Sequence, residues 1–318
     1  MKCVVTGAAG FIGSHLCEAL LRAGNQVLGL DAFNAYYVRA VKERNLTAAR
    51  TSSAFRFQTV DLRVDAIEPH LTEAEVIFHL AAMPGLVKSW TDFHEYWTCN
   101  AQATQRLLEA ARGLGSGLRR VIYASTSSVY GRFGSGDESL PTRPVSPYGL
   151  TKLAGEHLCR AYGDAYGLPW VVLRYFSVYG PRQRPDMGYH RFIAALLQDK
   201  PITVYGDGNQ VRGNTYVEDC VQATVAAAEA RPGETYNVGG GEAASVWDIV
   251  RKLEALAGRP VQMRQEVERP GDQRYTFADT SRIRRDLGWE PRVSLDDGLG
   301  RQWQWQRGQQ EHAVARAA

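Results

Sequence analysis

Cysteine is scarce in this sequence, and its five cysteines lie far apart without a Cys-x-x-Cys pair. That distribution argues against a disulfide framework and against a zinc site. Long apolar runs are also lacking, because no stretch approaches the roughly 18 apolar residues that a membrane span requires. The first predicted strand begins at residue 3, which leaves no room for a signal peptide. We therefore expect a cytoplasmic protein with no metal site and no membrane contact.

A charge excess of one sign is lacking as well. Lys and Arg together number 37, Asp and Glu 34, and the formal net charge is +3. The basic residues form no cluster of the kind that marks a nucleic-acid-binding surface, so we expect no nucleic-acid partner. A length of 318 residues suggests two packed domains, or one domain with a large elaboration, and a hydrophobic content of 44% excludes the disordered and fibrous classes.

Short apolar runs alternate with helical patterns through the first half. The pattern predicts a helix at residues 13–23 and six strands, at residues 3–5, 27–30, 55–60, 76–80, 121–124 and 170–175. Near-continuous apolar strands separated by helices are typical of a parallel sheet covered on both faces. The predicted fold class is therefore α/β, a doubly wound parallel (Rossmann) sheet with a smaller C-terminal α/β domain.

The pattern changes after Tyr175. Residues 177–188 are rich in proline and glycine and are expected to form a loop. We assign residues 1–176 to a first domain, with returning segments near 215–240, and residues 177–318 mainly to a second domain.

Three glycines follow the first strand at the spacing G-x-x-G-x-x-G. Gly7 allows a tight turn, Gly10 lets backbone N–H groups approach a pyrophosphate, and Gly13 permits close packing of a helix on the strand. A structural loop could use the same glycines, but the strand, the helix and Asp31 at the next strand end all agree with a dinucleotide site. The Asp31 carboxylate would accept hydrogen bonds from the ribose hydroxyls and repel a 2′-phosphate, which favours NAD over NADP.

Asp61 and Leu62 follow the third strand and form a second predicted wall of this site. The Asp61 side chain could contact the adenine amino group. It could equally cap the N-terminus of a helix.

Tyr148 and Lys152 lie four residues apart, on one face of a helix predicted to start after Pro147. An ammonium near a phenol lowers the phenol pKa from about 10, which makes it a general base near neutral pH. A Tyr-x-x-x-Lys pair also occurs by chance on surface helices. Here it follows both the glycine loop and the hydroxyl-rich residues 125–131, which leave a strand at its carboxyl end, where ligands bind in such sheets.

Together these motifs resemble the extended short-chain dehydrogenases/reductases, in their nucleotide-sugar epimerase/dehydratase branch. The resemblance runs from residue 2 to about residue 305 and is carried by residues 6–16, 79–82, 125–131, 148–152 and 174–187. It implies that Thr126 binds the reacting sugar oxygen, that Tyr148 is the base and that Lys152 is its electrostatic partner. It also implies NAD contacts from Gly7, Gly10, Phe11, Ile12, Gly13, Asp31, Asp61, Leu62, Leu80, Ala81, Ala82, Asn100, Tyr148 and Lys152. Within that set, Asn100 matches an asparagine that supports the active-site helix.

The same resemblance favours a 4-epimerase. Dehydratases of the branch carry an Asp-Glu pair directly after the catalytic threonine, and UDP-glucuronate decarboxylases carry a glutamate one residue further on. Ser127 and Ser128 occupy those positions here. A reaction that removes and returns one hydride needs neither acid. A dehydratase or decarboxylase with displaced acids, and a non-catalytic NAD-sensing protein, remain alternatives.

The substrate expected from the resemblance is a UDP-sugar. Residues 31–37 and the Arg-Pro-Asp-Met segment at 184–187 resemble UDP-glucuronate 4-epimerases; UDP-glucose or UDP-galactose, and pentoses or modified sugars, are the alternatives. The implied substrate-binding residues are Ser127, Ser128, Ser177, Arg184, Arg212 and Arg274, with Arg184 at the C6 carboxylate and the last two at the diphosphate. The branch usually has Asp after the first diphosphate arginine, whereas this chain has Gly213. Helices near 96–112 and 148–166 match those through which the family dimerises, so a homodimer is expected.

Overall fold

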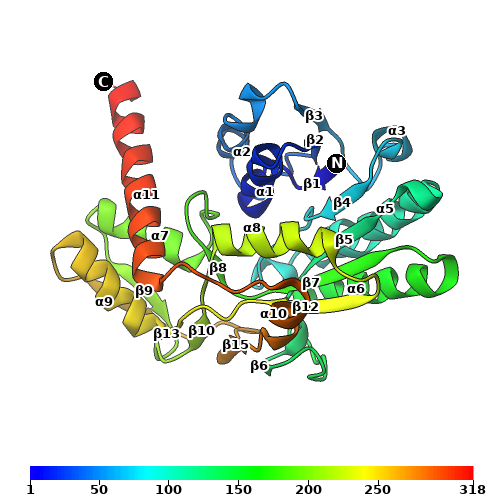
Figure 1. Ribbon diagram of the computed structural model, residues 1–318. Coiled ribbons are helices and arrows are strands. Elements are labelled where there is room, and N and C mark those ends of the chain that lie inside the picture. The colour runs from blue at the N-terminus through cyan, green and yellow to red at the C-terminus, as the bar shows by residue number, and fades with distance from the viewer. Residues whose placement is uncertain (318) are drawn as a thin grey trace.

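The computed structural model describes residues 1–317, and their side chains as far as residue 311. A sheet of seven parallel strands forms its centre, in the order β12-β7-β5-β4-β1-β2-β3 (Figure 1). The order reverses at β1, as in a doubly wound Rossmann sheet, so the predicted fold class is confirmed. The strands are β1 (Lys2–Thr6), β2 (Gln26–Asp31), β3 (Phe55–Thr59), β4 (Val76–His79), β5 (Arg120–Thr126), β7 (Trp170–Tyr175) and β12 (Glu234–Val238).

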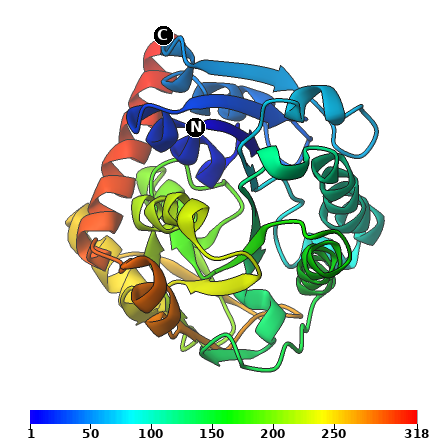
Figure 2. The same cartoon turned by 45° about the vertical axis from the view of Figure 1, so that its right-hand side comes forward.

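Helices cover both faces of this sheet (Figures 1 and 2). Their bounds are α1 (Phe11–Arg22), α2 (Arg39–Asn45), α3 (Glu68–Leu71), α4 (Phe93–Trp97), α5 (Ala103–Arg112), α6 (Pro147–Tyr166), α7 (Gly188–Leu197), α8 (Val217–Ala226), α9 (Val246–Ala257), α10 (Ser281–Leu287) and α11 (Leu295–Ala317).

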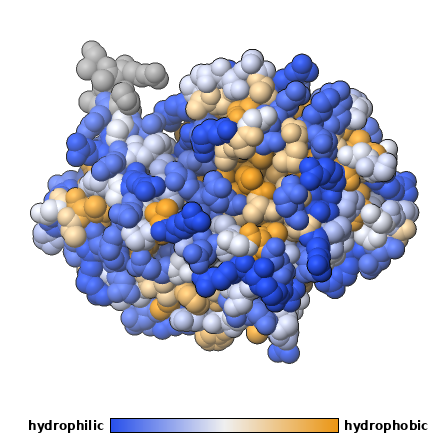
Figure 3. All heavy atoms as spheres, viewed as in Figure 1, coloured by the Kyte–Doolittle hydropathy of each residue, from blue (hydrophilic) through white to orange (hydrophobic). Residues whose placement is uncertain are grey.

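Successive strand residues point to opposite faces of the sheet, which explains the continuous apolar runs. Val5 and Phe78 pack in a core with α1 and α8, whereas Val4 and Ile77 pack in another with α5 and α6. On the face shown in Figure 3, apolar residues gather over α1 and α8, and hydrophilic residues cover most of the remainder. Among residues 1–317, no helix has both the length and the apolar character needed to cross a membrane.

A smaller set of strands lies beyond the carboxyl ends of the large sheet. A four-stranded sheet has the order β13-β10-β15-β6, and two strand pairs, β8 with β11 and β9 with β14, complete it. Their bounds are β6 (Phe133–Gly136), β8 (Val178–Tyr179), β9 (Ile202–Tyr205), β10 (Val211–Gly213), β11 (Thr215–Tyr216), β13 (Ala243–Ser245), β14 (Met263–Glu266) and β15 (Tyr275–Ala278).

The two sheets exchange segments. β12, from the second half of the chain, pairs with β7 at the edge of the large sheet. β6, from the first half, pairs with β15 in the smaller sheet. The domain boundary at residue 176 stays a prediction. β6 does not follow it, because this strand precedes residue 176 but pairs with β15, about 140 residues later in the chain.

Two predicted helices differ in detail. The helix predicted at 13–23 begins earlier, at Phe11, because Gly10 rather than Gly13 is the N-cap of α1. The helix expected near 96–112 is divided by a π-helical segment, Thr98–Gln102, which separates α4 from α5. π-Helical segments are frequent at functional sites.

Candidate active site

In the loop between β1 and α1, the backbone packs closely against the segment that follows β4 and against the first turn of α1. Gly7 has a φ of 72°, and a Cβ there would lie 2.8 Å from the backbone nitrogen of Ala81. A Cβ at Gly13 would collide with the Gly7 carbonyl oxygen. No side chain caps the N-terminus of α1 at Gly10, so the first N–H groups of the helix remain available to an anion.

Asp31 ends β2 beside this loop. Its Oδ2 accepts the N–H of Ala9 at 3.1 Å, and its Oδ1 accepts the N–H of Phe33 at 2.8 Å. Burial raises the pKa of Asp31, while the charge of Lys42 lowers it. Lys42 Nζ donates to Oδ1 of Asn34 at 2.7 Å, and this hydrogen bond helps to hold the ammonium group where its charge acts on Asp31. Neither Lys42 nor Asn34 was predicted as a site residue, although Asn34 lies within residues 31–37, which carry the resemblance; nothing in the sequence marks Lys42.

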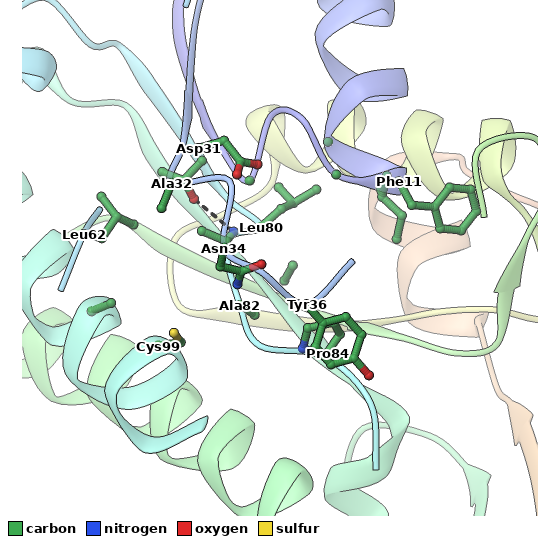
Figure 4. A pocket seen from close by; sticks show the side chains of 18 of the residues that line it. Phe11, Asp31, Ala32, Asn34, Tyr36, Leu62, Leu80, Ala82, Pro84 and Cys99 are labelled. Carbon is green, nitrogen blue, oxygen red and sulfur yellow. Dashed lines mark hydrogen bonds between the residues drawn. The ribbon is translucent and has the colours of Figure 1, made fainter. Parts of the chain in front are cut away.

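One pocket, the glycine-loop pocket, opens at the carboxyl ends of the strands around this loop. Figure 4 shows Asp31, Leu62 and Cys99, from three separate segments, arranged around it. The predicted cofactor residues that line it are Gly7, Gly10, Phe11, Ile12, Gly13, Asp31, Asp61, Leu62, Leu80, Ala81, Ala82, Tyr148 and Lys152. Their contact with a cofactor stays a prediction, but the fold does bring them to one cavity.

Asp61 is held by Arg63 rather than by a helix. Both carboxylate oxygens accept from the Arg63 guanidinium, at 2.7–3.1 Å, and Oδ1 also accepts the Arg63 N–H at 3.0 Å. These hydrogen bonds lower the pKa of Asp61. The N-cap alternative is therefore not seen, because residues 61–65 form a turn and α3 begins only at Glu68. Contact with adenine stays a prediction.

Asn100 lies behind the pocket wall and is fully buried. Its Oδ1 accepts the N–H of Met83 at 2.7 Å, and its Nδ2 donates to the Met83 carbonyl and to Thr151 Oγ1, both at 3.0 Å. Asn100 thus joins the segment after β4 to α6. The structure places it in a supporting position and not on the pocket surface.

The helix α6 begins at Pro147, where Ser146 is the N-cap and its hydroxyl accepts the N–H of Gly149 at 3.1 Å. A Cβ at Gly149 would lie 2.7 Å from the Ser128 carbonyl oxygen. Glycine at this position therefore lets the first turn of α6 lie directly against the turn that follows β5.

Tyr148 and Lys152 both face the glycine-loop pocket from α6. Burial raises the pKa of Tyr148, while the charge of Arg184 and a hydrogen bond with Thr126 lower it. Burial lowers the pKa of Lys152 to about 7, and its Nζ lies 4.2 Å from the centre of the Tyr123 ring. The pKa of Tyr148 is therefore raised overall and not lowered, as was expected from Lys152, and the charge that opposes the rise is that of Arg184.

Two turns beyond Tyr148, a buried ion pair fixes α6 to the sheet. Arg174 of β7 donates from Nε to Glu156 Oε1 at 3.0 Å and from Nη2 to Oε2 at 2.7 Å. The Ser125 hydroxyl also donates to Glu156 Oε1, and Arg174 Nη1 donates to the Tyr130 hydroxyl at 2.8 Å. The side chains of Glu156 and Arg174 are only 8% and 7% exposed. This network sets the position of α6, and with it that of Tyr148.

Thr126, Ser127 and Ser128 lie where β5 passes into a 3₁₀ turn. All three are buried, and Thr126 Oγ1 accepts the N–H of Ser128 at 3.2 Å. Gln273, which was not predicted, donates to the carbonyls of Ser127 at 3.2 Å and Gly131 at 2.8 Å. Of the three hydroxyl residues, only Thr126 affects the pKa of Tyr148, which its side chain lowers.

Arg184 stands on the wall of the same pocket as Tyr148. Its guanidinium binds Asp186 through two parallel hydrogen bonds, Nε to Oδ1 and Nη2 to Oδ2, both at 3.0 Å. The Tyr36 hydroxyl donates to Asp186 Oδ2 at 3.2 Å. A fork of this kind is the geometry with which arginine recognises carboxylates.

A second pocket, the arginine pocket, adjoins the first on the side of the smaller sheet. Ser177 lines it, together with the guanidinium-bearing residues Arg191, Arg212 and Arg269. Burial lowers the pKa of Arg212, and its Nη2 donates to Asp272 at 2.8 Å. Three guanidinium groups, together with the carboxylates of Asp186 and Asp272, thus line the pocket, and guanidinium groups are the usual partners of a polyanionic ligand.

Arg274 is not part of that group. It is half-buried and binds both oxygens of Asp207 at 2.7 Å, because the turn after β9 carries Asp207 to its side. Arg191 and Arg269, which line the arginine pocket in its place, were missed by the sequence prediction. No spacing signal distinguishes them from other surface arginines.

The glycine-loop pocket fits a dinucleotide. A Cβ at Gly7 or Gly13 would clash with neighbouring backbone, so the tight loop requires glycine there, and the open N-terminus of α1 favours negative charge beside it. The Asp31 carboxylate stands at the end of β2, where ribose hydroxyls can donate to it.

Comparison with known proteins agrees with this geometry. A family model described as the NAD dependent epimerase/dehydratase family matches residues 3–239. An uncharacterized UDP-glucose epimerase, YtcB, of Bacillus subtilis (strain 168) is 45% identical over 94% of this chain and 96% of its own. A UDP-glucuronate 4-epimerase of Thermodesulfobacterium geofontis is 36% identical over 96% of this chain and 95% of its own. The crystal structure of UDP-glucuronic acid 4-epimerase from Bacillus cereus, in complex with UDP-glucuronic acid and NAD, superimposes with a TM-score of 0.94 at 44% identity, covering 97% of this chain and all of that one.

Proposed function

This chain belongs to the NAD-dependent epimerase/dehydratase family, and we propose that it is an isomerase that uses NAD to interconvert UDP-glucuronate and UDP-galacturonate by inversion at C4. In this proposal NAD binds in the glycine-loop pocket. The sugar lies against Tyr148, and the diphosphate and uridine lie in the arginine pocket, where Arg191, Arg212 and Arg269 offer positive charge.

In the reaction, Tyr148 accepts the proton of the sugar 4-hydroxyl, and the Thr126 hydroxyl binds the same oxygen. Bound NAD supplies the hydride chemistry, taking a hydride from C4 and returning it to the opposite face. The charge of Arg184 favours the phenolate form of Tyr148. When the hydride returns, Tyr148 gives its proton back to the oxygen at C4. Lys152, which lines the same pocket, is proposed to contact bound NAD and to be the electrostatic partner of Tyr148.

The observation that carries the choice of substrate is the position of Arg184. Its guanidinium faces the pocket that contains Tyr148, so a C6 carboxylate would meet it when C4 lies at the phenol. We propose that Ser127 and Ser177 supply hydroxyl donors to the same carboxylate and that Ser128 also contacts the substrate. No carboxylate follows Thr126 at the positions of Ser127 and Ser128, which supports epimerisation over dehydration.

A second candidate is the interconversion of UDP-glucose and UDP-galactose, which the name of the Bacillus subtilis relative suggests. The same Tyr148 chemistry serves either sugar. A neutral C6 hydroxyl, however, would leave the Arg184 charge with Asp186 alone as its partner.

The deciding experiment incubates purified protein with UDP-glucuronate and, separately, with UDP-glucose. Chromatography and proton NMR then resolve the C4 epimers and any pentose. UDP-galacturonate from the first substrate without net NADH is expected. UDP-galactose as the only product would refute the acid specificity while keeping the mechanism, and a pentose would indicate a decarboxylase.

A Tyr148→Phe variant separates an enzyme from an NAD-sensing protein. Loss of the phenolic base should lower turnover by at least about a hundredfold while bound NAD is retained. Unchanged behaviour in every assay would favour the sensing protein.

We also propose a homodimer formed through α5 and α6, in the cytoplasm. Apolar side chains stand exposed on or beside these helices, at Trp97, Leu150 and Tyr166, and all five cysteines are free thiols, which suits a reducing compartment. Light scattering coupled to gel filtration measures the mass: about twice 35.3 kDa is expected, and 35.3 kDa would refute the dimer.

A further inference from the structure

Three glutamines on α11 follow one another at intervals of four residues, so they share one face of the helix. That face lies along α7 and the segment that precedes it (Figure 1). Gln302 is fully buried, and Gln306 nearly so. The amide nitrogens of the three donate in turn to Gln183 Oε1 at 2.8 Å, the His190 carbonyl at 2.9 Å and, from Gln310, the Leu197 carbonyl at 3.3 Å.

Gln302 closes a network around the segment that carries Arg184. Its Oε1 accepts the N–H of Gly180 at 2.9 Å, while its Nε2 holds Gln183. Gln183 in turn donates to the Val178 carbonyl at 3.2 Å and accepts the N–H of His190 at 2.9 Å. Gly180 and His190, which lie on either side of Arg184, are therefore both hydrogen-bonded to the paired side-chain amides of Gln302 and Gln183. Arg184 directly follows Gln183 in the chain.

The opposite side of the segment is fastened to α1. Arg182 donates to Ser14 Oγ at 3.2 Å and binds Glu18 at 2.7 Å, and His15 contacts the Pro181 carbonyl at 3.0 Å. Arg182 has a φ of 64°, a left-handed conformation that a residue with a side chain adopts only when its surroundings hold it. The conformation that presents Arg184 to the pocket thus depends on anchors at both sides.

We propose that Gln302, from the C-terminal helix, is a positioning residue for Arg184 and thereby sets how often the reaction intermediate loses carbon dioxide. The inference rests on the proposed function, since it concerns the C6 carboxylate. Oxidation at C4 makes the sugar a β-keto acid. If its C5–C6 bond breaks, carbon dioxide leaves, the electron pair remains as a C4–C5 enolate, and a proton added at C5 gives a UDP-4-keto-pentose. A guanidinium held in one place keeps the carboxylate from the orientation that this cleavage requires.

The test is a Gln302→Met variant, which keeps the side-chain length but leaves the Gly180 N–H without its partner and Gln183 Oε1 with the His190 N–H as its remaining donor. We expect carbon dioxide and pentose product per UDP-galacturonate formed to rise about tenfold. The KM for UDP-glucuronate should rise about threefold or more, whereas kcat should change less than KM, because Tyr148 and α6 are untouched.

Gln310→Met is the matched control. It removes the same kind of hydrogen bond from the same helix, but at Leu197, the far end of α7. Its product ratio should equal that of the wild type, even if its melting temperature falls.

Three outcomes decide the matter. A wild type that forms no UDP-galacturonate refutes the proposed function itself. An active wild type with the same product ratio in the folded Gln302→Met variant refutes the positioning role, since a purely structural glutamine would lower stability alone. If Gln302→Met does not fold, Gln306→Met replaces it, and there a smaller rise in the ratio supports the proposal while a wild-type ratio overturns it.

Discussion

The ion pair between Glu156 and Arg174 allows a quantitative test of how α6 is held. In a Glu156→Gln variant the shape of the side chain is kept and one charge is removed. The new amide nitrogen would face Arg174 Nη2, so two donors would meet where a hydrogen bond of 2.7 Å stands now. Arg174 would remain buried with its charge uncompensated.

Removing one partner of a buried ion pair destabilises proteins by about 3–5 kcal/mol. Because glutamine keeps one acceptor for Ser125 and Arg174, we expect the lower end, a loss of about 3 kcal/mol in the free energy of unfolding. At about 2 °C per kcal/mol for a chain of this size, the melting temperature should fall by roughly 6 °C.

Thermal and urea unfolding followed by circular dichroism measure this change. The control is Glu43→Gln, which removes a carboxylate from an exposed pair with Arg39 and should change stability by less than about 0.5 kcal/mol. Replacing both charges, in Glu156→Leu with Arg174→Met, should restore part of the loss, because no unpaired charge remains. A Glu156→Gln variant that melts within one degree of the wild type would refute the reasoning.

Burial lowers the pKa of His79 to about 3, well below the roughly 6.5 of an unfolded chain. The unfolded state therefore binds the extra proton first, so the stability present above pH 6.5 should decline as the pH falls, by about 2 kcal/mol between pH 6.5 and 5.0 from this residue. Urea midpoints across that range measure it, and an equal slope in His79→Gln would contradict the assignment. Gly13→Ala places a methyl group against the Gly7 carbonyl, so NAD that copurifies should fall at least about tenfold; full NAD content by chromatography would show that the loop accommodates it. Asp31→Ser removes the ribose acceptor, and calorimetry should show weaker NAD binding with less discrimination against NADP; unchanged preference would assign the choice elsewhere.

Much of the fold was predictable because its signals are local. The buried strands alternate their side chains between two apolar cores, so each reads as a short continuous apolar run. The glycine spacing depends on contacts between Gly7, Gly13 and their immediate surroundings. Both patterns can be recognised within about ten residues of sequence, and the parallel sheet, by aligning the carboxyl ends of its strands, brings most of the predicted cofactor residues to one pocket.

The parts that escaped prediction depend on distant partners. The sequence does not distinguish Arg274 from Arg269. The difference arises in the fold, where the turn that carries Asp207 pairs that carboxylate with Arg274 and Arg269 lines the arginine pocket. The effect of Arg184 on Tyr148 joins residues 36 positions apart through the folding of the intervening chain. Gln273 and Gln302 belong to no sequence motif, and their hydrogen bonds to Ser127 and Gln183 join residues more than 100 positions apart.

The strand exchange limits how the protein can be divided. β12 covers one side of β7 from Glu234 opposite Val171 to Val238 opposite Tyr175, which is all of the strand except its first residue. A fragment that ended at residue 176 would leave the N–H and C=O groups on that side of β7 unpaired, on a strand made almost entirely of buried apolar residues. Open edges of this kind recruit other chains into intermolecular sheets. A truncated nucleotide-binding half should therefore aggregate on expression, and a circular permutant that keeps β12 is the better route to a minimal scaffold.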